Sequence, residues 1–190
     1  MQHPTNIQGV SFDEIASRFG TPVYVYDANV IIRQVRQLKE HFSSTDLKIK
    51  FAAKALTNIS ILGLLKSQGV GVDAVSVNEV RLALHCGFAA PEINYTPNSV
   101  GFAEIEEAVA LGVGINLDNL SALEKFGQRY GTSYPCGLRL NPNIMAGGNL
   151  KISTGHVQSK FGISIDQIQD IHNLVERYSI NISGLHIHTG

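Results

Sequence analysis

The sequence contains few cysteines, almost no net charge and no long apolar run, and each shortage excludes a class of protein. The two cysteines, Cys86 and Cys136, lie far apart and form neither a C-x-x-C pair nor a His/Cys spacing typical of metal ligands. We expect both to be reduced thiols, as in a cytoplasmic protein. A net charge of −1 gives no electrostatic basis for binding nucleic acid or a membrane surface.

Targeting signals are also missing from the sequence. The opening Met-Gln-His-Pro-Thr-Asn lacks the basic-then-apolar order of a signal peptide. No apolar run approaches the length needed to cross a membrane. With 190 residues, 44% of them hydrophobic and 16% charged, the chain is long enough for one globular domain with a sizeable core.

Short β-rich runs alternate with amphipathic helical patterns along the chain. The β-rich runs cover residues 22–27, 48–54, 70–76, 93–98, 113–118, 136–142 and 182–188. Between them, apolar residues recur at every third or fourth position, as in Ile31, Val35, Leu38 and Phe42. Such regular alternation predicts parallel strands that are covered on both faces or closed into a barrel.

A repeated capping-box pattern marks the expected helix starts, with a serine followed three positions later by Glu or Gln. The pattern begins at Ser11, Ser76, Ser121 and Ser164. Glycines follow several helical patterns, as helix ends often require, and these are Gly87, Gly112 and Gly131. The sequence therefore predicts both ends of several helices.

The pattern predicts an α/β fold, a partial (β/α)8 TIM-type barrel. No Gly-x-Gly-x-x-Gly follows an early strand, which disfavours a dinucleotide-binding doubly wound sheet. Six barrel-type units are present where a closed barrel needs eight. We therefore predict an incomplete barrel over residues 28–190, preceded by a helix and a strand over residues 1–27. The chain is expected to be the first part of a longer protein.

Polar side chains stand at the ends of six consecutive predicted strands, where (β/α) barrels build their active sites. They are Lys54, Asp73, Ser76, Thr96, Asn98, Asp118, Asn119, Arg139, Asn141, His186 and His188. This mixture of amine, carboxylates, guanidinium and imidazoles suits a zwitterionic, phosphate-bearing ligand better than a metal ion. For the two histidines, metal ligation and a purely structural role stay open as alternatives.

Lys54 is the candidate nucleophile in this set. It lies in the run Phe51-Ala-Ala-Lys-Ala55, which we expect to be a buried strand that delivers one amine among alanines. Burial disfavours a charged amine, and a neutral amine forms a Schiff base with an aldehyde, as in pyridoxal enzymes. An ordinary surface lysine at a strand end is the alternative.

A long glycine-rich segment over residues 141–162 follows the fifth barrel-type strand. Loops of this length are uncommon inside a compact domain and often serve as lids or binding loops. A flexible insertion is the alternative interpretation.

Six motifs, in matching order and spacing, resemble the alanine racemase-like, fold type III family of pyridoxal-phosphate-dependent decarboxylases. The motifs cover residues 19–27, 51–55, 72–79, 138–142, 153–155 with 160–162, and 184–190. The resemblance implies that Lys54 carries pyridoxal 5'-phosphate as a Schiff base and that Asp73 lies beside this lysine and tunes it. It further implies that Arg139 lines the cofactor pocket and that His188 stacks on the pyridine ring, with no metal at the site.

The resemblance also implies a reaction, the decarboxylation of meso-2,6-diaminopimelate to L-lysine in lysine biosynthesis. Arginine, ornithine and carboxynorspermidine remain as alternative substrates of the same enzyme class. A non-catalytic decarboxylase-like regulator is a second class, which the presence of Lys54 and His188 disfavours. A cofactor-free α/β protein is a third.

Several parts of the family's architecture would follow Gly190. They are the phosphate-binding loop, the acid that contacts the pyridine nitrogen, and a C-terminal β-domain that residues 1–27 would join. The expected complete protein is a cytoplasmic homodimer acting on a small amino acid, with neither nucleic acid nor membrane as a partner.

Overall fold

The computed structural model describes residues 5–144 and 159–188, which belong to two compact units, Met1–Lys48 and Ile49–Gly190. The first unit contains an antiparallel pair of strands followed by two helices. These elements are β1 (Asn6–Ile7), β2 (Val10–Ser11), α1 (Phe12–Phe19) and α2 (Ala28–His41). As predicted, Ser11 caps α1, because its hydroxyl accepts a hydrogen bond of 3.1 Å from the Glu14 backbone N–H.

The strand predicted over residues 22–27 is wrong for this structure, in which the segment is neither strand nor helix. A strand needs a hydrogen-bonded neighbour, and none is paired with residues 22–27 within the described part of the chain. The side chains of this segment are largely exposed, Tyr24 by 90%. Local β propensity is therefore present here without the partner that a strand requires.

The second unit is built on a parallel sheet with the strand order β3-β4-β5-β6-β7-β8, and β9 pairs with β7. The strands are β3 (Lys50–Ala52), β4 (Gly71–Ala74), β5 (Ile93–Tyr95), β6 (Gly114–Leu117), β7 (Cys136–Asn141), β8 (Ile163–Ser164) and β9 (Ile182–Ile187). Six of these are the barrel-type strands that the sequence predicts, whereas the two-residue β8 was not expected. The fold class is confirmed as a partial barrel, since the described strands form an open sheet.

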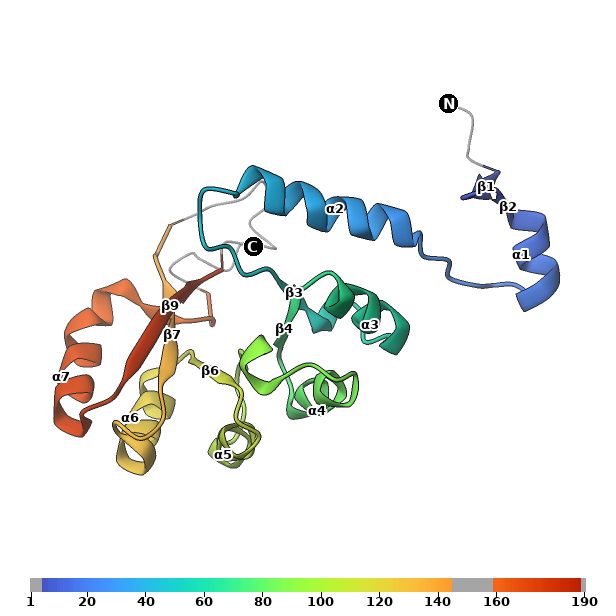
Figure 1. Ribbon diagram of the computed structural model, residues 1–190. Helices are drawn as coiled ribbons and strands as arrows, with labels where there is room; N and C mark the ends of the chain where they lie inside the picture. The colour runs from blue at the N-terminus through green and yellow to red at the C-terminus, as the bar shows by residue number, and fades with distance from the viewer. Residues whose placement is uncertain (1–4, 145–158, 189–190) are drawn as a thin grey trace. The chain divides into compact units, whose positions relative to one another are not determined.

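Helices connect successive strands and lie on the outer side of the curved sheet, as Figure 1 shows. They are α3 (Ile59–Ser67), α4 (Val77–His85), α5 (Phe102–Ala110), α6 (Leu120–Tyr130) and α7 (Ile168–Tyr178), with short 3-10 turns at η1 (Ala53–Ala55), η2 (Ala90–Glu92) and η3 (Ile165–Gln167). Ser76 and Ser164 act as helix caps as predicted. The prediction for Ser121 is wrong, because Asn119 caps α6 two residues earlier.

The two faces of the sheet differ in polarity, and this difference positions the site. On the outer face, apolar side chains such as Val72, Ile93 and Leu117 are fully buried against the helices. Because successive side chains of a strand point to opposite faces, the residues between them point inward. These inward positions include Asp73, between Val72 and Ala74, and they carry polar residues on several strands. Apolar burial holds the layers together, while the inner face is left for polar contacts.

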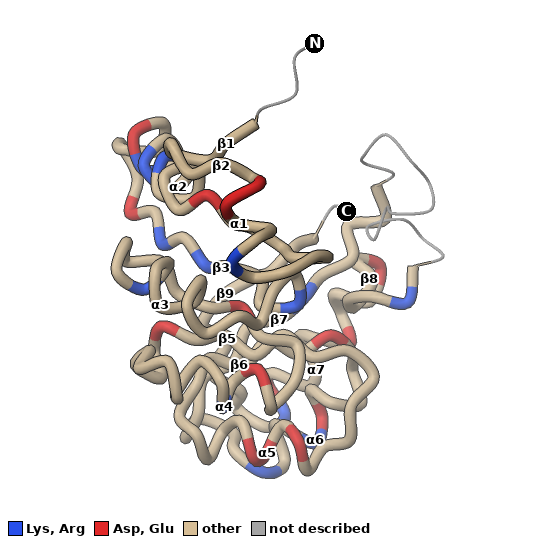
Figure 2. Tube along the Cα trace, turned by 90° about the vertical axis from the view of Figure 1, so that its right-hand side faces the viewer, with Lys and Arg blue, Asp and Glu red and all other residues tan. Residues whose placement is uncertain are grey.

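Charged side chains lie mainly on the outer helices, and Figure 2 shows acidic and basic segments on α5 and α6. Arg129 on α6 pairs with Glu106 on α5 at 3.1 Å, and Arg81 on α4 pairs with Glu107. These pairs are exposed to solvent, where such contacts typically contribute about 1 kcal/mol or less to stability. They are surface features, distinct from the charged groups of the inner face.

The cysteines and the lengths of the helices bear on two expectations from the sequence. Cys86 and Cys136 are both free thiols. Cys136 is buried, and this burial raises the pKa of its thiol to about 12. Among the described residues, no helix combines the length and the apolar character needed to cross a membrane.

Candidate active site

The inner strand ends of the Ile49–Gly190 unit surround a cleft of about 330 Å³. Seven of the predicted strand-end residues line it, namely Lys54, Asp73, Thr96, Asn98, Arg139, His186 and His188. Val75 and Phe161 also line the cleft and were not singled out from the sequence. The volume lies at the lower end of the range of small-molecule pockets, about 300–1,000 Å³.

The other four predicted strand-end residues do not belong to this lining. Ser76 caps α4 and Asn119 caps α6, through hydrogen bonds from backbone N–H groups at 3.2 and 2.8 Å. Asn141 accepts a hydrogen bond of 3.0 Å from the Asn143 backbone N–H. Asp118 is buried and accepts hydrogen bonds from the amides of Asn98 and Asn119. Their roles are local, although Asp118 supports Asn98 in the cleft wall.

Lys54 reaches the cleft from a different local structure than the one predicted. Strand β3 ends at Ala52, and Lys54 belongs to the 3-10 turn η1 that follows. Its side chain is exposed, while its neighbour Ala53 is fully buried. The expectation of an amine desolvated within an apolar strand is therefore wrong. A turn places the lysine at the cleft because the chain must leave the sheet there to begin α3.

A row of hydrogen bonds crosses the inner face from β4 to β9. Thr96 Oγ1 donates to Asp73 Oδ1 at 2.6 Å, and Asn116 Nδ2 donates to Thr96 Oγ1 at 2.9 Å. Asn116 Nδ2 also lies 3.4 Å from His186 Nδ1. Sequence reasoning missed Asn116, although it lies on β6 two residues before Asp118, which follows that strand, and this spacing predicts that both side chains lie on the inner face.

Arg139 is a buried guanidinium in the cleft wall. Burial lowers the pKa of Arg139, whereas the charges of Asp118 and Asp73 raise it. Its Cζ lies 4.7 Å from the centre of the Phe161 ring, within the range of a cation–π contact. Phe161 comes from the segment just before β8, so this contact joins the predicted binding loop to the strand-end site.

Both cleft histidines have lowered pKa values. For His186, burial is the main cause, the charges of Arg139 and His188 lower the pKa further, and Asp73 opposes them. For His188, burial comes first, then the charges of Arg139 and Lys54, again opposed by Asp73. Both imidazoles are therefore neutral near pH 7, and each can serve as a hydrogen-bonding group or an aromatic surface.

The predicted binding loop is only partly described. The stretch Ser153-Thr-Gly155 and residues 145–149 lie outside the described residues, as do Thr189 and Gly190. Within residues 5–144 and 159–188, no group of three or more His, Cys, Asp or Glu side chains is arranged to hold a metal ion.

The cleft combines groups that recognise a particular kind of ligand. An amine can bond covalently to an aldehyde, a guanidinium attracts an anion, and a neutral imidazole can lie against an aromatic ring. A planar, anionic aldehyde satisfies all three. The observed groups thus fit pyridoxal phosphate, as the sequence predicts.

Comparison with known proteins also indicates a pyridoxal-binding protein. Residues 28–190 match the family described as "Pyridoxal-dependent decarboxylase, pyridoxal binding domain". Diaminopimelate decarboxylase of Escherichia coli strain K12 is 32% identical over 190 residues, which cover 98% of this chain and 44% of that protein. The chain therefore spans less than half the length of this curated relative.

Solved structures of decarboxylases share the fold. Diaminopimelate decarboxylase from Helicobacter pylori, complexed with L-lysine, matches with a TM-score of 0.83 and 30% identity over 95% of this chain and 47% of that chain. Lysine/ornithine decarboxylase from Vibrio vulnificus, complexed with putrescine, matches with a TM-score of 0.76 and 27% identity over the same shares.

Proposed function

Because the chain belongs to the family of pyridoxal-dependent decarboxylases, we propose that it forms the N-terminal portion of an enzyme that converts meso-2,6-diaminopimelate to L-lysine. The convergence of Lys54, Asp73, Arg139 and His188 on one cleft carries this proposal. The similarity to diaminopimelate decarboxylases along nearly the whole chain supports the choice of substrate. The expected partner is thus a small amino acid.

Pyridoxal 5'-phosphate, when bound, supplies the electron sink that accepts the bonding pair as carbon dioxide leaves. Lys54 would hold this cofactor, since its amine lines the cleft and can react with an aldehyde. The exposed position of Lys54 leaves its amine accessible to the cofactor and to an incoming amino acid. Asp73, on the neighbouring strand and in the same cleft, provides a negative charge that orients cationic groups.

Arg139 and His188 hold the ligand in our proposal. The buried Arg139 would offer its positive charge to an anionic group, and its guanidinium lies in a cation–π contact with Phe161. His188, neutral near pH 7, would offer an aromatic face to the pyridine ring of the cofactor. A fixed ring plane determines which substrate bond is aligned for cleavage.

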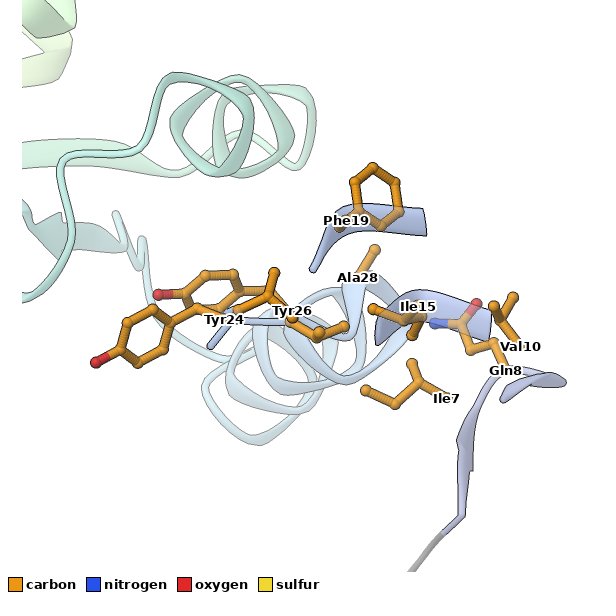
Figure 3. Close-up of a pocket in the computed structure, with 10 residues that line it drawn as sticks. Ile7, Gln8, Val10, Ile15, Phe19, Tyr24, Tyr26 and Ala28 are labelled. Carbon is orange, nitrogen blue, oxygen red and sulfur yellow. The ribbon is translucent and has the colours of Figure 1, made fainter. Parts of the chain in front are cut away.

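Residues 1–27 have a separate role in this proposal, since they would join a C-terminal β-domain of the complete protein. Figure 3 shows side chains from β1 to the start of α2 that line an apolar pocket within the Met1–Lys48 unit. The volume of this pocket is about 490 Å³. Phe19 and Tyr24 are among its exposed residues. The unpaired extended segment over residues 22–27 would supply a strand to that domain. Residues 28–190 then constitute the cofactor-binding domain.

The complete enzyme is a cytoplasmic homodimer in this proposal, as the family resemblance implies. Another basic amino acid as substrate is the second candidate, favoured by the structural match to a lysine/ornithine decarboxylase complexed with putrescine. Arginine, ornithine and carboxynorspermidine therefore belong in the same test.

Release of carbon dioxide from each candidate amino acid by the purified holoenzyme tests the proposal. We expect turnover of meso-diaminopimelate with kcat/KM at least about 100-fold above that of ornithine or arginine, since a site built to bind a second carboxylate discriminates strongly against ligands lacking it. Preference for ornithine would favour the second candidate. Cofactor binding without release of carbon dioxide from any candidate would favour a non-catalytic regulator.

Borohydride reduction of the holoenzyme tests the covalent role of Lys54. Peptide mass mapping should then find the pyridoxyl group on Lys54, because its amine is the one that lines the cleft among residues 5–144 and 159–188. Lys50 is an internal control, since its amine donates to Asn94 at 2.8 Å and does not belong to the cleft lining. A label on Lys50 or Lys160 would contradict the assignment.

A further inference from the structure

Four polar side chains form one hydrogen-bonded row at the cleft, three of them on strands and Thr96 directly after β5. Asp73, Thr96 and His186 line the cleft, whereas Asn116 does not belong to its lining and connects the other residues. The row runs from Asp73 on β4 through Thr96 and Asn116 to His186 on β9. It therefore links two walls of the site that are separated by three strands.

The Asp73 carboxylate determines which group donates and which accepts in every hydrogen bond of the row. An ionised carboxylate only accepts hydrogen bonds, so Thr96 gives its single hydroxyl proton to Asp73. Thr96 Oγ1 must then accept from Asn116, which turns the NH2 end of its amide toward the threonine. The same NH2 group faces His186 Nδ1, which must accept in turn. The proton of a neutral His186 ring is thereby assigned to Nε2.

Gly137 gives Asn116 the room to reach His186. It lies on β7 between two strands, paired with Asn116 of β6 on one side and with Gly184 of β9 on the other. A Cβ atom on Gly137 would collide with Asn116 Oδ1, so any side chain there would displace the amide. The absence of a side chain on β7 thus allows a contact that spans this strand.

A parallel arrangement on the neighbouring strands provides a matched comparison. Gly114 on β6 pairs with Asn94 on β5, and a Cβ on Gly114 would lie 2.6 Å from Asn94 Oδ1. Asn94 accepts a hydrogen bond from Lys50 and belongs neither to the cleft lining nor to the row. The Asn116/Gly137 pair therefore belongs to the hydrogen-bonded row, whereas the Asn94/Gly114 pair has the same geometry but lies outside the row.

We infer that Asn116 is a positioning residue that holds His186 as the neutral Nε2–H tautomer and, through Thr96, fixes the Asp73 carboxylate. The groups that face His186 are consistent with a neutral ring, because burial and the charges of Arg139 and His188 lower its pKa while Asp73 opposes them. A ring with its proton on Nε2 can donate one hydrogen bond to an anionic group in the cleft. The consequence for turnover rests on the proposed function, whereas the tautomer does not.

Nitrogen NMR of ¹⁵N-histidine-labelled holoenzyme tests this inference directly, because an unprotonated ring nitrogen resonates far downfield of a protonated one. The His186→Gln variant identifies the resonances of His186. In the wild type, we expect Nδ1 to be unprotonated and Nε2 protonated. In Asn116→Asp, the new carboxylate accepts instead of donating, so the proton should move to Nδ1 and the pKa of His186 should rise.

Further variants separate positioning from general damage. Asn116→Ala and Gly137→Ala should both give a mixture of the two tautomers, and Asn116→Ala should lower kcat about fivefold to tenfold, the effect of one lost hydrogen bond. Thr96→Ser should keep the wild-type tautomer, whereas Thr96→Val should lose it. Asn94→Ala and Gly114→Ala should leave the His186 resonances unchanged.

The outcomes distinguish this inference from the proposed function. A wild-type His186 protonated on Nδ1, or an Asn116→Asp variant with unchanged ring resonances, would overturn the inference even in an active decarboxylase. The expected tautomer in a holoenzyme without turnover would uphold the inference and count against the decarboxylase. If Gly137→Ala does not fold, the nearly isosteric Asn116→Asp still decides.

Discussion

At the scale of single residues, burial lowers the pKa of every cationic group whose shift is resolved in the cleft, because burial disfavours the charged form. It lowers the pKa of Arg139, His186 and His188. Arginine nevertheless stays protonated in proteins, whereas an imidazole readily loses its proton near neutral pH. The cleft therefore keeps the charge of Arg139 for binding an anion and holds two neutral rings beside it.

This arrangement predicts a loss of stability in mild acid. The folded-state pKa values of His186 and His188 lie below the ordinary value of 6.5. Between those values and 6.5 the unfolded chain binds more protons, so the free energy of unfolding decreases as the pH falls through this window. Urea midpoints measured from pH 8 to pH 5 should decrease below about pH 6.5. In His186→Gln the decrease should be smaller. An identical decrease would show that His186 does not contribute to the pH dependence of stability.

His188 should matter more for turnover than His186. We assign stacking on the pyridine ring to His188, whereas His186 contributes only one hydrogen bond to a group in the cleft. His188→Ala should lower kcat of the holoenzyme by about 100-fold, since a misplaced reacting group can cost that much. His186→Ala should lower it by about tenfold or less. The reverse order would show that the roles of the two histidines had been exchanged.

The composition of the cleft could be predicted from the sequence, but its connections could not. Strand-end position alone brought Lys54, Asp73 and Arg139 into one set, because parallel strands end at one edge. Asn116 escaped notice because its role depends on a missing side chain, that of Gly137 on the next strand. Phe161 escaped because its contact with Arg139 joins residues from separate elements. Local patterns do not encode such contacts.

At the scale of elements, the start of α6 shows how two capping signals compete. Ser121 matches the capping box, yet Asn119 accepts the hydrogen bond from the Ala122 N–H at 2.8 Å and caps the helix. Asn119 comes directly after the buried Asp118, so the helix begins as soon as the chain leaves β6. Tertiary position decides between two suitable caps.

Substitution at the two candidate caps should give different losses of stability. Asn119→Ala should lower the free energy of unfolding by about 1 kcal/mol, the usual value of a helix cap. Ser121→Ala should change it by less than about 0.5 kcal/mol, because alanine is favourable inside a helix. Urea unfolding of both variants provides the comparison. Equal losses would show that Ser121 also stabilises the helix start.

Non-local pairing explains the two errors in the predicted strands. Residues 22–27 have a β-rich composition but no strand beside them in the described structure. Strand β8 has only two residues, and it forms because the chain around Gly162 passes close to β7. A Cβ at Gly162, whose φ is +80°, would lie 2.9 Å from the Asn141 backbone N. Composition predicts neither the missing partner nor this close approach.

At the scale of the whole molecule, the described sheet has two open sides. Strand β3 pairs only with β4, and β9 pairs only with β7, within residues 5–144 and 159–188. The apolar side chains of Leu185 and Ile187 on β9 are 67% and 55% exposed. Unpaired edges and exposed apolar side chains both favour association with another surface. In the proposed enzyme, the remaining barrel units would cover them.

Residues 1–190 expressed alone should therefore self-associate and should not release carbon dioxide from diaminopimelate, even with added pyridoxal phosphate. Light scattering coupled to size exclusion measures the first property, and a carbon dioxide assay measures the second.

Replacing both Leu185 and Ile187 with Gln should increase the monomeric fraction of this fragment, because the change removes apolar surface from β9. The same change at the exposed Ile59 and Ile168, which lie on helices, should have less effect. Turnover would still be absent, since the cleft of this unit supplies Lys54 and Arg139 but depends on the rest of the proposed enzyme for its phosphate loop. A monodisperse, active chain of residues 1–190 would contradict both the role of these edges and the partial-barrel proposal.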